Sequence, residues 1–513
     1  MASSAKAPGR AQVPKGENAH VVVVGAGMGG LAAAIDLARS GLRVTLLERA
    51  EAPGGKVRAL DVAGRQIDTG PTVFTMRWLF EALFNDAGAS LDERLGLQPL
   101  EVLARHGWVG SDPLDLYADV ERTVAAIDAF AGGTEADAYR RFAARSEAIF
   151  ETLDHSFMRR SQPGPVALPL SMGLGGPRRL LATRPFTTLW RELGRCFRDP
   201  RLRQLFGRYA TYCGSSPWAA PATLMLIAHA ERAGVWTVKG GMPRLAQALH
   251  ELAQEQGVTT RFGEGVARLN VAGRSVRGVV TDSGEKIPAD AVVFNGDVVA
   301  LENGLLGDEA RQALPRRTGP RSLSAVTWSL VARPRGFPLH HHTVLFGTDY
   351  RDEFDAIFHR GAVTAQPTVY LCAQDRHDGS APRPEVGQPA SERVFLLVNA
   401  PPKPMDESMA AEIEARTFAF LSDHGLEFDI EARQRLTPNE WAERFPGSAG
   451  AIYGWPTHGW RGSFQRAGAR GRISGLYFAG GTVHPGPGIP MALQSGRIAA
   501  SEALGDLGRR SVD

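Results

Sequence analysis

A glycine-rich segment near the N-terminus carries the clearest chemical signal in the sequence. It is a GxGxxG pattern made of Gly25, Ala26, Gly27, Met28, Gly29 and Gly30. The first glycine of such a pattern permits a tight turn, the second lets the backbone approach a pyrophosphate, and the last lets a helix pack closely on a strand. Free N–H groups and the positive dipole at the N-terminus of the following helix attract phosphate. The segment therefore predicts a site for a dinucleotide.

An acidic residue follows at the distance that this chemistry requires. Glu48 comes about 20 residues after the first glycine and directly after the apolar run 43–47. A carboxylate placed there accepts hydrogen bonds from the ribose hydroxyls of an adenosine. Glycine pattern, helix and acidic residue together are far more specific than the glycines alone. We expect Glu48, with Arg49 beside it, to hold the adenosine half of the ligand.

A second glycine pair favours FAD over a nicotinamide cofactor. Gly54 and Gly55 are followed by Lys56, and Arg58 lies close by. A glycine pair before a basic residue resembles the second phosphate contact of flavoproteins of the glutathione-reductase type, which nicotinamide dehydrogenases usually lack. No second GxGxxG follows a predicted strand later in the chain, so we expect no NAD(P) site. FAD is the predicted cofactor.

The other reactive side chains form no recognisable catalytic set. The sequence has no GxSxG or HExxH pattern, and its three cysteines show no CxxC spacing. His340, His341 and His342 are adjacent, but neighbours on an extended strand point to opposite faces, so we expect no metal site there. The sequence assigns no catalytic residue, and its few cysteines indicate a reducing compartment.

Several segments together resemble the bacterial-type carotenoid desaturases, from about residue 19 to residue 505. Besides the two glycine segments they are the stretches 68–72, 234–242, 289–297 and 339–350. The most specific segment is the block 477–492, which reads YFAGGTVHPGPGIPMA. Its ending is more similar to the 1-hydroxycarotenoid (methoxyneurosporene) 3,4-desaturases than to the phytoene desaturases.

The resemblance implies where the flavin and the substrate lie. It adds these contacts to the cofactor site: Gly55, Lys56, Thr72, Val266, Gly480, Gly481, Ile489, Pro490 and Met491. Val266 matches a strand whose backbone meets the adenine, and the amides of Ile489 and Met491 would face the pyrimidine end of the isoalloxazine. Trp236 and His484 are the candidates for contact with the substrate.

The implied reaction is FAD-dependent desaturation of an acyclic hydroxylated or methoxylated carotenoid at C-3,4, in biosynthesis of the spheroidene or spirilloxanthin type. One allylic hydrogen leaves as a hydride and its neighbour as a proton, so a dry slot and a weak base suffice. The alternatives are a phytoene desaturase, another carotenoid desaturase or isomerase, a different flavin oxidase, and a lipid-binding protein without catalysis. Oxygen or a quinone is the expected electron acceptor.

The elements that must position these residues belong to an α/β fold. Strand, helix and strand within residues 21–47 open a Rossmann-type, doubly wound sheet of the glutathione-reductase kind. We expect a discontinuous FAD-binding domain built from residues 19–90, 236–300 and 446–513. An inserted mixed α/β domain for the substrate and the membrane would take residues 91–235 and 301–445.

Two further regions have recognisable patterns. Residues 77–230 carry mostly helical patterns, whereas 1–18 are rich in Ala, Ser, Pro and Lys and predict a disordered lead rather than a signal peptide.

Charge is unevenly distributed along the chain. The 513 residues carry a net charge of only +3, which gives no reason to expect nucleic acid binding. Residues 155–208, however, contain eleven arginines and two acidic residues. Apolar residues lie between them as possible anchors: Phe186, Leu189, Trp190, Leu193, Phe197, Leu202, Leu205 and Phe206. Because no apolar run is long enough to span a bilayer, we expect a cytoplasmic protein attached peripherally to the inner or photosynthetic membrane, from which the lipophilic substrate comes.

Overall fold

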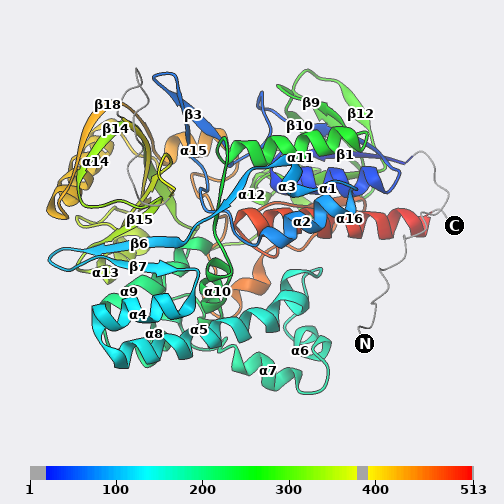
Figure 1. The fold of residues 1–513 in the computed structure, drawn as a ribbon. Coiled ribbons are helices and arrows are strands. Elements are labelled where there is room, and N and C mark those ends of the chain that lie inside the picture. The colour runs from blue at the N-terminus through cyan, green and yellow to red at the C-terminus, as the bar shows by residue number, and fades with distance from the viewer. Residues whose placement is uncertain (1–18, 378–390, 511–513) are drawn as a thin grey trace.

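A five-stranded parallel sheet draws its strands from well-separated parts of the chain (Figure 1). The computed structural model describes residues 19–377 and 391–510, so the predicted lead 1–18 lies outside the described residues. In sheet order the strands are β19 (Leu476–Phe478), β13 (Ala291–Phe294), β1 (His20–Val24), β2 (Arg43–Leu47) and β9 (Thr259–Arg261). All four neighbouring pairs are parallel, and Val21, Val22 and Val23 are fully buried, as in sheets covered on both faces. The predicted Rossmann-type α/β fold is confirmed, whereas the boundaries of its domains stay a prediction.

Helices α1 (Met28–Arg39) and α16 (Ile489–Arg510) pack side by side, so that two distant parts of the sequence meet. Their approach depends on glycine, because a Cβ atom added to Gly496 would lie only 2.0 Å from the carbonyl oxygen of Gly29. Arg497 of α16 also donates to Asp36 of α1 at 3.0 Å. Helices α11 (Pro243–Glu255) and α2 (Arg77–Asp86) complete this layer.

A second sheet of seven strands forms the other main layer, at the left of Figure 1. In sheet order it contains β18 (Leu426–Leu436), β14 (Ser324–Gly336), β17 (Glu392–Ala400), β16 (Val369–Ala373), β15 (His342–Phe346), β6 (Val102–Trp108) and β7 (Leu114–Tyr117). Its neighbours are antiparallel except β15 and β6. Helix α14 (Glu407–Asp423) covers one face, where its Ile413 and Phe420 join a core with Trp328 and other strand residues.

The region 77–230 is mostly helical, as expected, but it also contains three strands that the sequence did not predict. β5 (Leu97–Pro99), β6 and β7 all lie in it. β5 pairs with β8 (Trp236–Val238), and β6 pairs with β15, so their partners come from much later in the chain. A local pattern of residues contains no information about such a partner, and the helical interpretation therefore extended across these strands.

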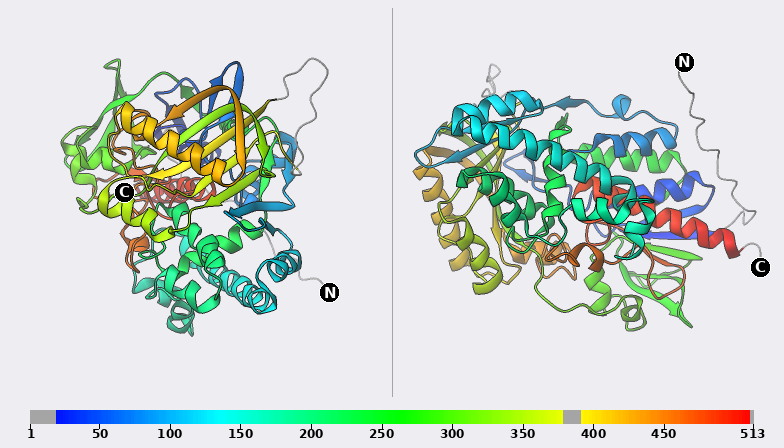
Figure 2. Two further views of the ribbon diagram at one scale, coloured as in Figure 1. Left: turned by 90° about the vertical axis from the view of Figure 1, so that its left-hand side faces the viewer. Right: turned by 90° about the horizontal axis from the view of Figure 1, so that it is seen from below.

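A layer of helices lies below the two sheets in Figure 1 and is seen from below in Figure 2. It consists of α4 (Val120–Ala131), α5 (Gly133–Leu153), α6 (Ala167–Ser171), α7 (Gly176–Ala182), α8 (Leu189–Cys196), α9 (Pro200–Gly207) and α10 (Leu226–Arg232). Six of the apolar residues proposed as membrane anchors are instead buried in this layer: Leu189, Leu193, Phe197, Leu202, Leu205 and Phe206. They alternate with arginines because each of these short helices is amphipathic, with its apolar face turned into the core.

The remaining elements are short. They are the hairpin β3 (Ala59–Val62) and β4 (Arg65–Asp68), the sheet β10 (Val266–Ala272), β11 (Ser275–Thr281) and β12 (Lys286–Pro288), and the helices α3 (Leu91–Arg94), α12 (Val298–Glu302), α13 (Tyr350–Asp355) and α15 (Pro438–Arg444). Among the described residues, no helix is both long and apolar enough to cross a membrane.

Candidate cofactor and substrate site

One large cavity, of about 1180 Å³, lies at the carboxyl ends of the parallel strands and extends to the seven-stranded sheet and the helical layer. Val24, Leu47 and Phe294, each the last residue of its strand, line it. Ligands of open α/β sheets bind at these strand ends. A pocket for one small ligand typically measures about 300–1,000 Å³, so this cavity has room for a dinucleotide and part of a second molecule.

The glycine segment forms one wall of the cavity. Gly25 has φ +98°, a backbone conformation that glycine adopts without strain, and it turns the chain from β1 into α1. A Cβ atom on Gly27 would lie 2.9 Å from Asn295 Nδ2, and one on Gly30 would overlap the carbonyl oxygen of Gly25 at 1.9 Å. Gly25, Gly27, Met28 and Gly29 line the cavity, whereas Ala26 and Gly30 do not. The last glycine therefore serves the packing of helix on strand, and the exposed part of the loop fits a pyrophosphate.

Glu48 is held in place at the end of β2. Its Oε2 accepts a hydrogen bond from the N–H of Ala26 at 2.7 Å, and its Oε1 accepts one from Ala50 at 2.9 Å. The side chain is buried, yet it lines the cavity together with Arg49 and Val266. A carboxylate fixed by two N–H groups keeps lone pairs for ribose hydroxyls, so these residues fit an adenosine.

Gly55 and Lys56 both line the cavity, but the amino group of Lys56 is turned to protein. Its Nζ donates to the carbonyl oxygen of Ile452 and lies 5.4 Å from the centre of the Phe445 ring. Burial lowers the pKa of Lys56, and the neighbouring Asp297 opposes that effect. The predicted second phosphate contact can come from the Gly55 backbone, and Lys56 holds the loop in place through its hydrogen bond to Ile452.

The C-terminal block lines the cavity next to the glycine segment, since a Cβ atom on Gly29 would lie 2.7 Å from the N of Gly480. Gly480, Gly481, Ile489, Pro490 and Met491 all line the cavity, as does Thr72 from the segment before α2. Helix α16 begins at Ile489, so its first N–H groups, which lack acceptors within the helix, lie at this wall. The N-termini of α1 and α16 thus border the same cavity, and their positive dipole ends fit the phosphates and the electron-rich end of a reduced flavin.

The two residues proposed to contact the substrate do not line the cavity. His484 is buried, and its Nε2 lies 3.0 Å from the carbonyl oxygens of both Phe157 and Arg160. Burial lowers the pKa of His484 to about 4, so the ring is neutral near pH 7. Trp236 packs edge to face on Phe74, with ring centres 6.4 Å apart. Both side chains are placed as structural residues.

The half of the cavity away from the glycine segment is largely apolar. Its lining includes Leu153, Phe157, Met158, Leu224, Leu226, Ile227, Ala230, Phe395 and Leu397. Arg208, Tyr212 and Tyr370 are polar exceptions that sequence reasoning missed. Arg208 was one of eleven arginines in a run, and nothing in the local sequence marks Tyr370. Such a surface fits a long hydrocarbon that carries a polar group.

The histidine run departs from the expected alternation. His341 lies in a bend before β15, and its ring centre is 4.6 Å from that of His342. Together with Cys372 these histidines bring three possible ligand atoms within 4.8 Å of one another. One nitrogen of each ring has another partner: His341 Nδ1 lies 2.7 Å from the carbonyl oxygen of Arg376, and His342 Nδ1 lies 2.7 Å from Tyr370 Oη. His341 Nε2 lies 3.6 Å from Cys372 Sγ, and His342 Nε2 has no hydrogen-bond partner among the described residues. Burial raises the pKa of the Cys372 thiol, which opposes the thiolate that a metal requires.

Comparison with known proteins agrees with this geometry. The family model of flavin-containing amine oxidoreductases matches residues 28–504. The chain is 48% identical over 502 residues to the hydroxyneurosporene desaturase of Rubrivivax gelatinosus, covering 95% of this chain and 94% of that protein. It is 47% identical over 495 residues to the hydroxyneurosporene desaturase of Cereibacter sphaeroides, with 96% and 98% covered. The phytoene dehydrogenase of Streptomyces griseus is 33% identical, with 96% of both chains covered.

Solved structures resemble the chain in fold. Putrescine oxidase, as a redesigned variant, has a TM-score of 0.59 at 14% identity, covering 95% of this chain and 99% of that one. An oxidoreductase from Methanosarcina mazei has a TM-score of 0.58 at 15% identity, with 94% and 100% covered. With a Rossmann-type sheet, a large cavity that is apolar in one half, and these relatives, the chain belongs to the flavin-containing amine oxidoreductases and, among them, to the carotenoid desaturases.

Proposed function

We propose that this protein desaturates an acyclic hydroxylated or methoxylated carotenoid at C-3,4, with FAD as its cofactor. The observation that carries the proposal is the single cavity in which a dinucleotide cradle opens into an apolar chamber. Relatives that are 45–48% identical over nearly the whole chain are named hydroxyneurosporene desaturases, which supports the same substrate class here.

The cofactor would be held by three groups of residues. Glu48, Arg49 and Val266 would bind the adenosine, the α1 N-terminus with Gly55 the phosphates, and the start of α16 with Gly480 and Gly481 the isoalloxazine. When bound, FAD supplies a two-electron acceptor that takes up the departing hydride.

The chain itself supplies orientation and a dry environment. Hydrogen at C4 is allylic to the polyene, so its loss as hydride leaves a positive charge spread along the conjugated chain. The proton on C3 then becomes acidic enough for a weak base, and a new double bond forms between C3 and C4. Among the described residues, the carboxylates that line the cavity are Glu48, Asp282 and Asp297, and Asp297 is paired with Arg321 at 3.2 Å. Because a weak base suffices for the C3 proton, the apolar chamber does not require one of these carboxylates as a strong base. Its part is to exclude water and to align the substrate end.

The membrane surface is the proposed source of the substrate, and oxygen or a quinone the proposed final acceptor of the two electrons. Exposed apolar side chains gather around α6 and α7: Val166, Leu170, Leu174, Leu181 and Phe186. Arg178 and Arg179 are exposed on the same short segment. Exposed apolar side chains grouped on one short segment are typical of a surface that contacts a membrane or another protein. The chain leads from this segment directly back to Phe157 and Met158, which line the cavity.

Product analysis tests the proposed reaction. The FAD-loaded protein, given a 1-hydroxylated acyclic carotenoid dispersed in liposomes and a quinone, should yield a product lighter by two hydrogens, with one more conjugated double bond and a red-shifted spectrum. A product of unchanged mass would indicate an isomerase instead. Turnover of phytoene with no turnover of the hydroxylated compound would move the protein to the phytoene desaturases.

A further inference from the structure

A buried arginine lines the apolar chamber, although the proposed substrate is a hydrocarbon over most of its length. Arg208 begins the 3-10 turn Arg208–Cys213 and is 7% exposed. Its Nη1 donates to Tyr212 Oη at 3.4 Å, whereas its Nε–H has no hydrogen-bond partner among the described residues. The Nε atom is enclosed by protein, so a ligand in the chamber would meet the Nη groups of Arg208. A guanidinium has five N–H donors, and Tyr212 provides an acceptor for one of them, so an oxygen atom in the chamber would find a donor here.

A buried carboxylate supports Arg208 through Tyr212. Glu231 is buried and accepts hydrogen bonds from Tyr209 Oη at 2.8 Å and from Tyr212 Oη at 2.5 Å. The negative charge of Glu231 offsets the positive charge of the guanidinium. The Tyr212 hydroxyl donates its hydrogen bond to Glu231, so its oxygen is left to accept one from Arg208. The arginine is therefore oriented before any ligand binds, which lowers the cost of recognition.

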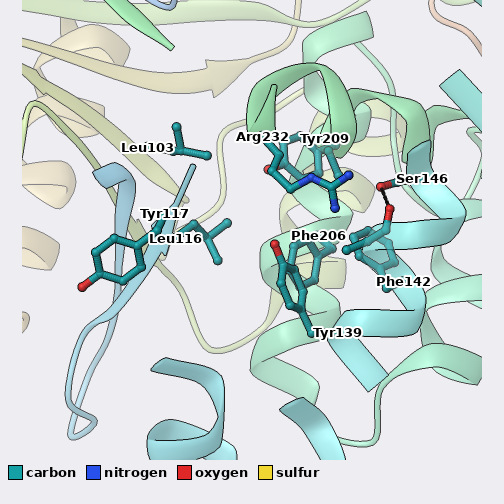
Figure 3. Close-up of a pocket in the computed structure, with 11 residues that line it drawn as sticks. Leu103, Leu116, Tyr117, Tyr139, Phe142, Ser146, Phe206, Tyr209 and Arg232 are labelled. Atoms are coloured by element: carbon teal, nitrogen blue, oxygen red, sulfur yellow. Dashed lines mark hydrogen bonds between the residues drawn. The ribbon is translucent and has the colours of Figure 1, made fainter. Parts of the chain in front are cut away.

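Aromatic packing makes this support rigid. Figure 3 shows Tyr209 beside Phe206 and Tyr139, and the Tyr139 and Phe206 rings are stacked with centres 5.8 Å apart. The small cavity between these side chains measures about 10 Å³, about the space of one water molecule. No ligand of useful size fits there, and Arg208 lines the large chamber rather than this small cavity.

A neighbouring hydroxyl in the chamber already has its partners. Tyr370 Oη lies 2.5 Å from Thr72 Oγ1 and 2.7 Å from His342 Nδ1. Thr72 belongs to the segment that also borders the proposed flavin site. Arg208 and Tyr212, in contrast, combine a charged donor with exposure to the chamber.

We propose that Arg208 donates to the oxygen at C1 of the carotenoid and so selects hydroxylated or methoxylated ends over hydrocarbon ends. This inference rests on the proposed function. Hydroxyl and ether oxygens both accept from a guanidinium, whereas a hydrocarbon end would leave the donor unpaired, and a site built for a hydrogen bond rejects such an analogue strongly. Because C1 is two bonds from C3, fixing its oxygen also places C3 and C4. The positive charge that develops spreads along the polyene, away from Arg208.

The test compares two carotenoids of equal length and unsaturation that differ only in the C1 oxygen. Anaerobic flavin reduction and binding, by quenching of tryptophan fluorescence, are measured for both with wild type, Arg208→Met, Tyr212→Phe and Arg203→Met. In Arg208→Met the preference for the oxygenated compound should fall about 10- to 100-fold in both measurements. This is the change in affinity expected from the loss of one hydrogen bond to a charged group. Binding of the hydrocarbon should stay the same or improve.

The other variants separate recognition from folding. Arg203 lies on α9, outside the cavity wall, and its Nε donates to the carbonyl oxygen of Phe197 at 2.7 Å, so Arg203→Met should keep the wild-type preference. Tyr212→Phe keeps the arginine but removes the acceptor that orients it, and it should lower the preference severalfold even if Arg208→Met does not fold. An unchanged preference in a folded, flavin-containing variant of Arg208 or Tyr212 would overturn the inference. If wild type reduces its flavin with neither carotenoid, the proposed function fails instead.

Discussion

Glu48 is the side chain on which the cofactor site depends most directly. It combines contact with the cavity and two hydrogen bonds from backbone N–H groups of the loops on either side. We expect Glu48→Ala to weaken FAD binding about 10- to 100-fold, because charge-assisted hydrogen bonds of about 1.5–3 kcal/mol are lost. Titration of the apoprotein with FAD measures this. Glu51→Ala removes an exposed carboxylate outside the cavity wall and should leave the affinity unchanged.

Single site residues could be predicted from the sequence where the ligand requires a particular residue type at a fixed spacing. Gly25 and Glu48 follow from the needs of a turn and a ribose contact, which are local and depend on few residues. Trp236 and His484 were proposed as polar groups that could contact the hydroxyl end of the substrate, whereas in the structure neither lines the cavity. Arg208 shows the converse, because its role depends on Glu231 and Tyr212, whose proximity only the folded chain reveals.

Helices α1 and α16 act as a unit, because the cofactor cavity lies at both of their N-termini. Their contact at Gly29 and Gly496 leaves no room for a methyl group. We expect Gly496→Ala to lower the free energy of unfolding by about 1–3 kcal/mol through overpacking, and to reduce FAD occupancy with it. Thermal unfolding and the flavin-to-protein absorbance ratio measure these effects.

A matched control lies on the same helix. A Cβ atom on Gly505 meets nothing within 4 Å, so Gly505→Ala should keep full occupancy and raise stability by about 0.5–1 kcal/mol through helix propensity. Equal behaviour of the two variants would contradict the role given to the contact of α1 with α16.

Helices and strands could be predicted from the sequence where neighbouring residues determine them, and not where a partner far along the chain does. The run from β1 through α1 to β2 follows from a buried strand, a glycine turn and a helix, all adjacent in sequence. β6 was missed because its pairing with β15 joins residues far apart in the chain. The helical layer was expected, yet which face of α8 and α9 is buried could be read only from the packed structure.

At the scale of the molecule, the exposed apolar residues around α6 and α7 predict binding to anionic membranes. Each basic group near such a surface contributes about 1 kcal/mol. In flotation with anionic liposomes, we expect Leu170→Ser/Leu174→Ser and Arg178→Glu/Arg179→Glu each to reduce recovery severalfold. Arg268→Glu/Arg277→Glu changes exposed charge on β10 and β11 and should float as wild type does. If all variants float equally, or if wild type floats equally with neutral and anionic lipid, the proposal that this segment binds anionic membranes is wrong.

Buried histidines predict loss of stability on mild acidification. Burial lowers the pKa of His341, His458 and His484 to about 4, so between about pH 6.5 and pH 4 the unfolded chain binds more protons than the folded one. Stability therefore falls as pH decreases through this window and is fully present above it. Asp68, whose pKa burial raises to about 6, opposes this trend, as do Glu302 and Glu353, whose pKa burial also raises.

The melting temperature measured from pH 7.5 to pH 5 checks this expectation. His458→Gln should reduce the fall by up to about 1.4 kcal/mol per pH unit, since one pKa unit corresponds to that energy. The exposed His359→Gln should leave the pH dependence as it is. A melting temperature that does not change between pH 7 and pH 5 would show that these histidines are accessible to protons in the folded protein.

We propose that one cavity brings FAD and a carotenoid end together for a two-electron oxidation. A single-turnover reaction tests it most directly: the FAD-loaded protein is mixed with a 1-hydroxylated acyclic carotenoid, without oxygen or quinone, and flavin and carotenoid absorbance are followed together. The flavin should bleach at the same rate as a red-shifted product appears, with one product formed for each flavin reduced. A carotenoid product that forms while the flavin stays oxidised, or a flavin that stays oxidised with no product, would contradict it.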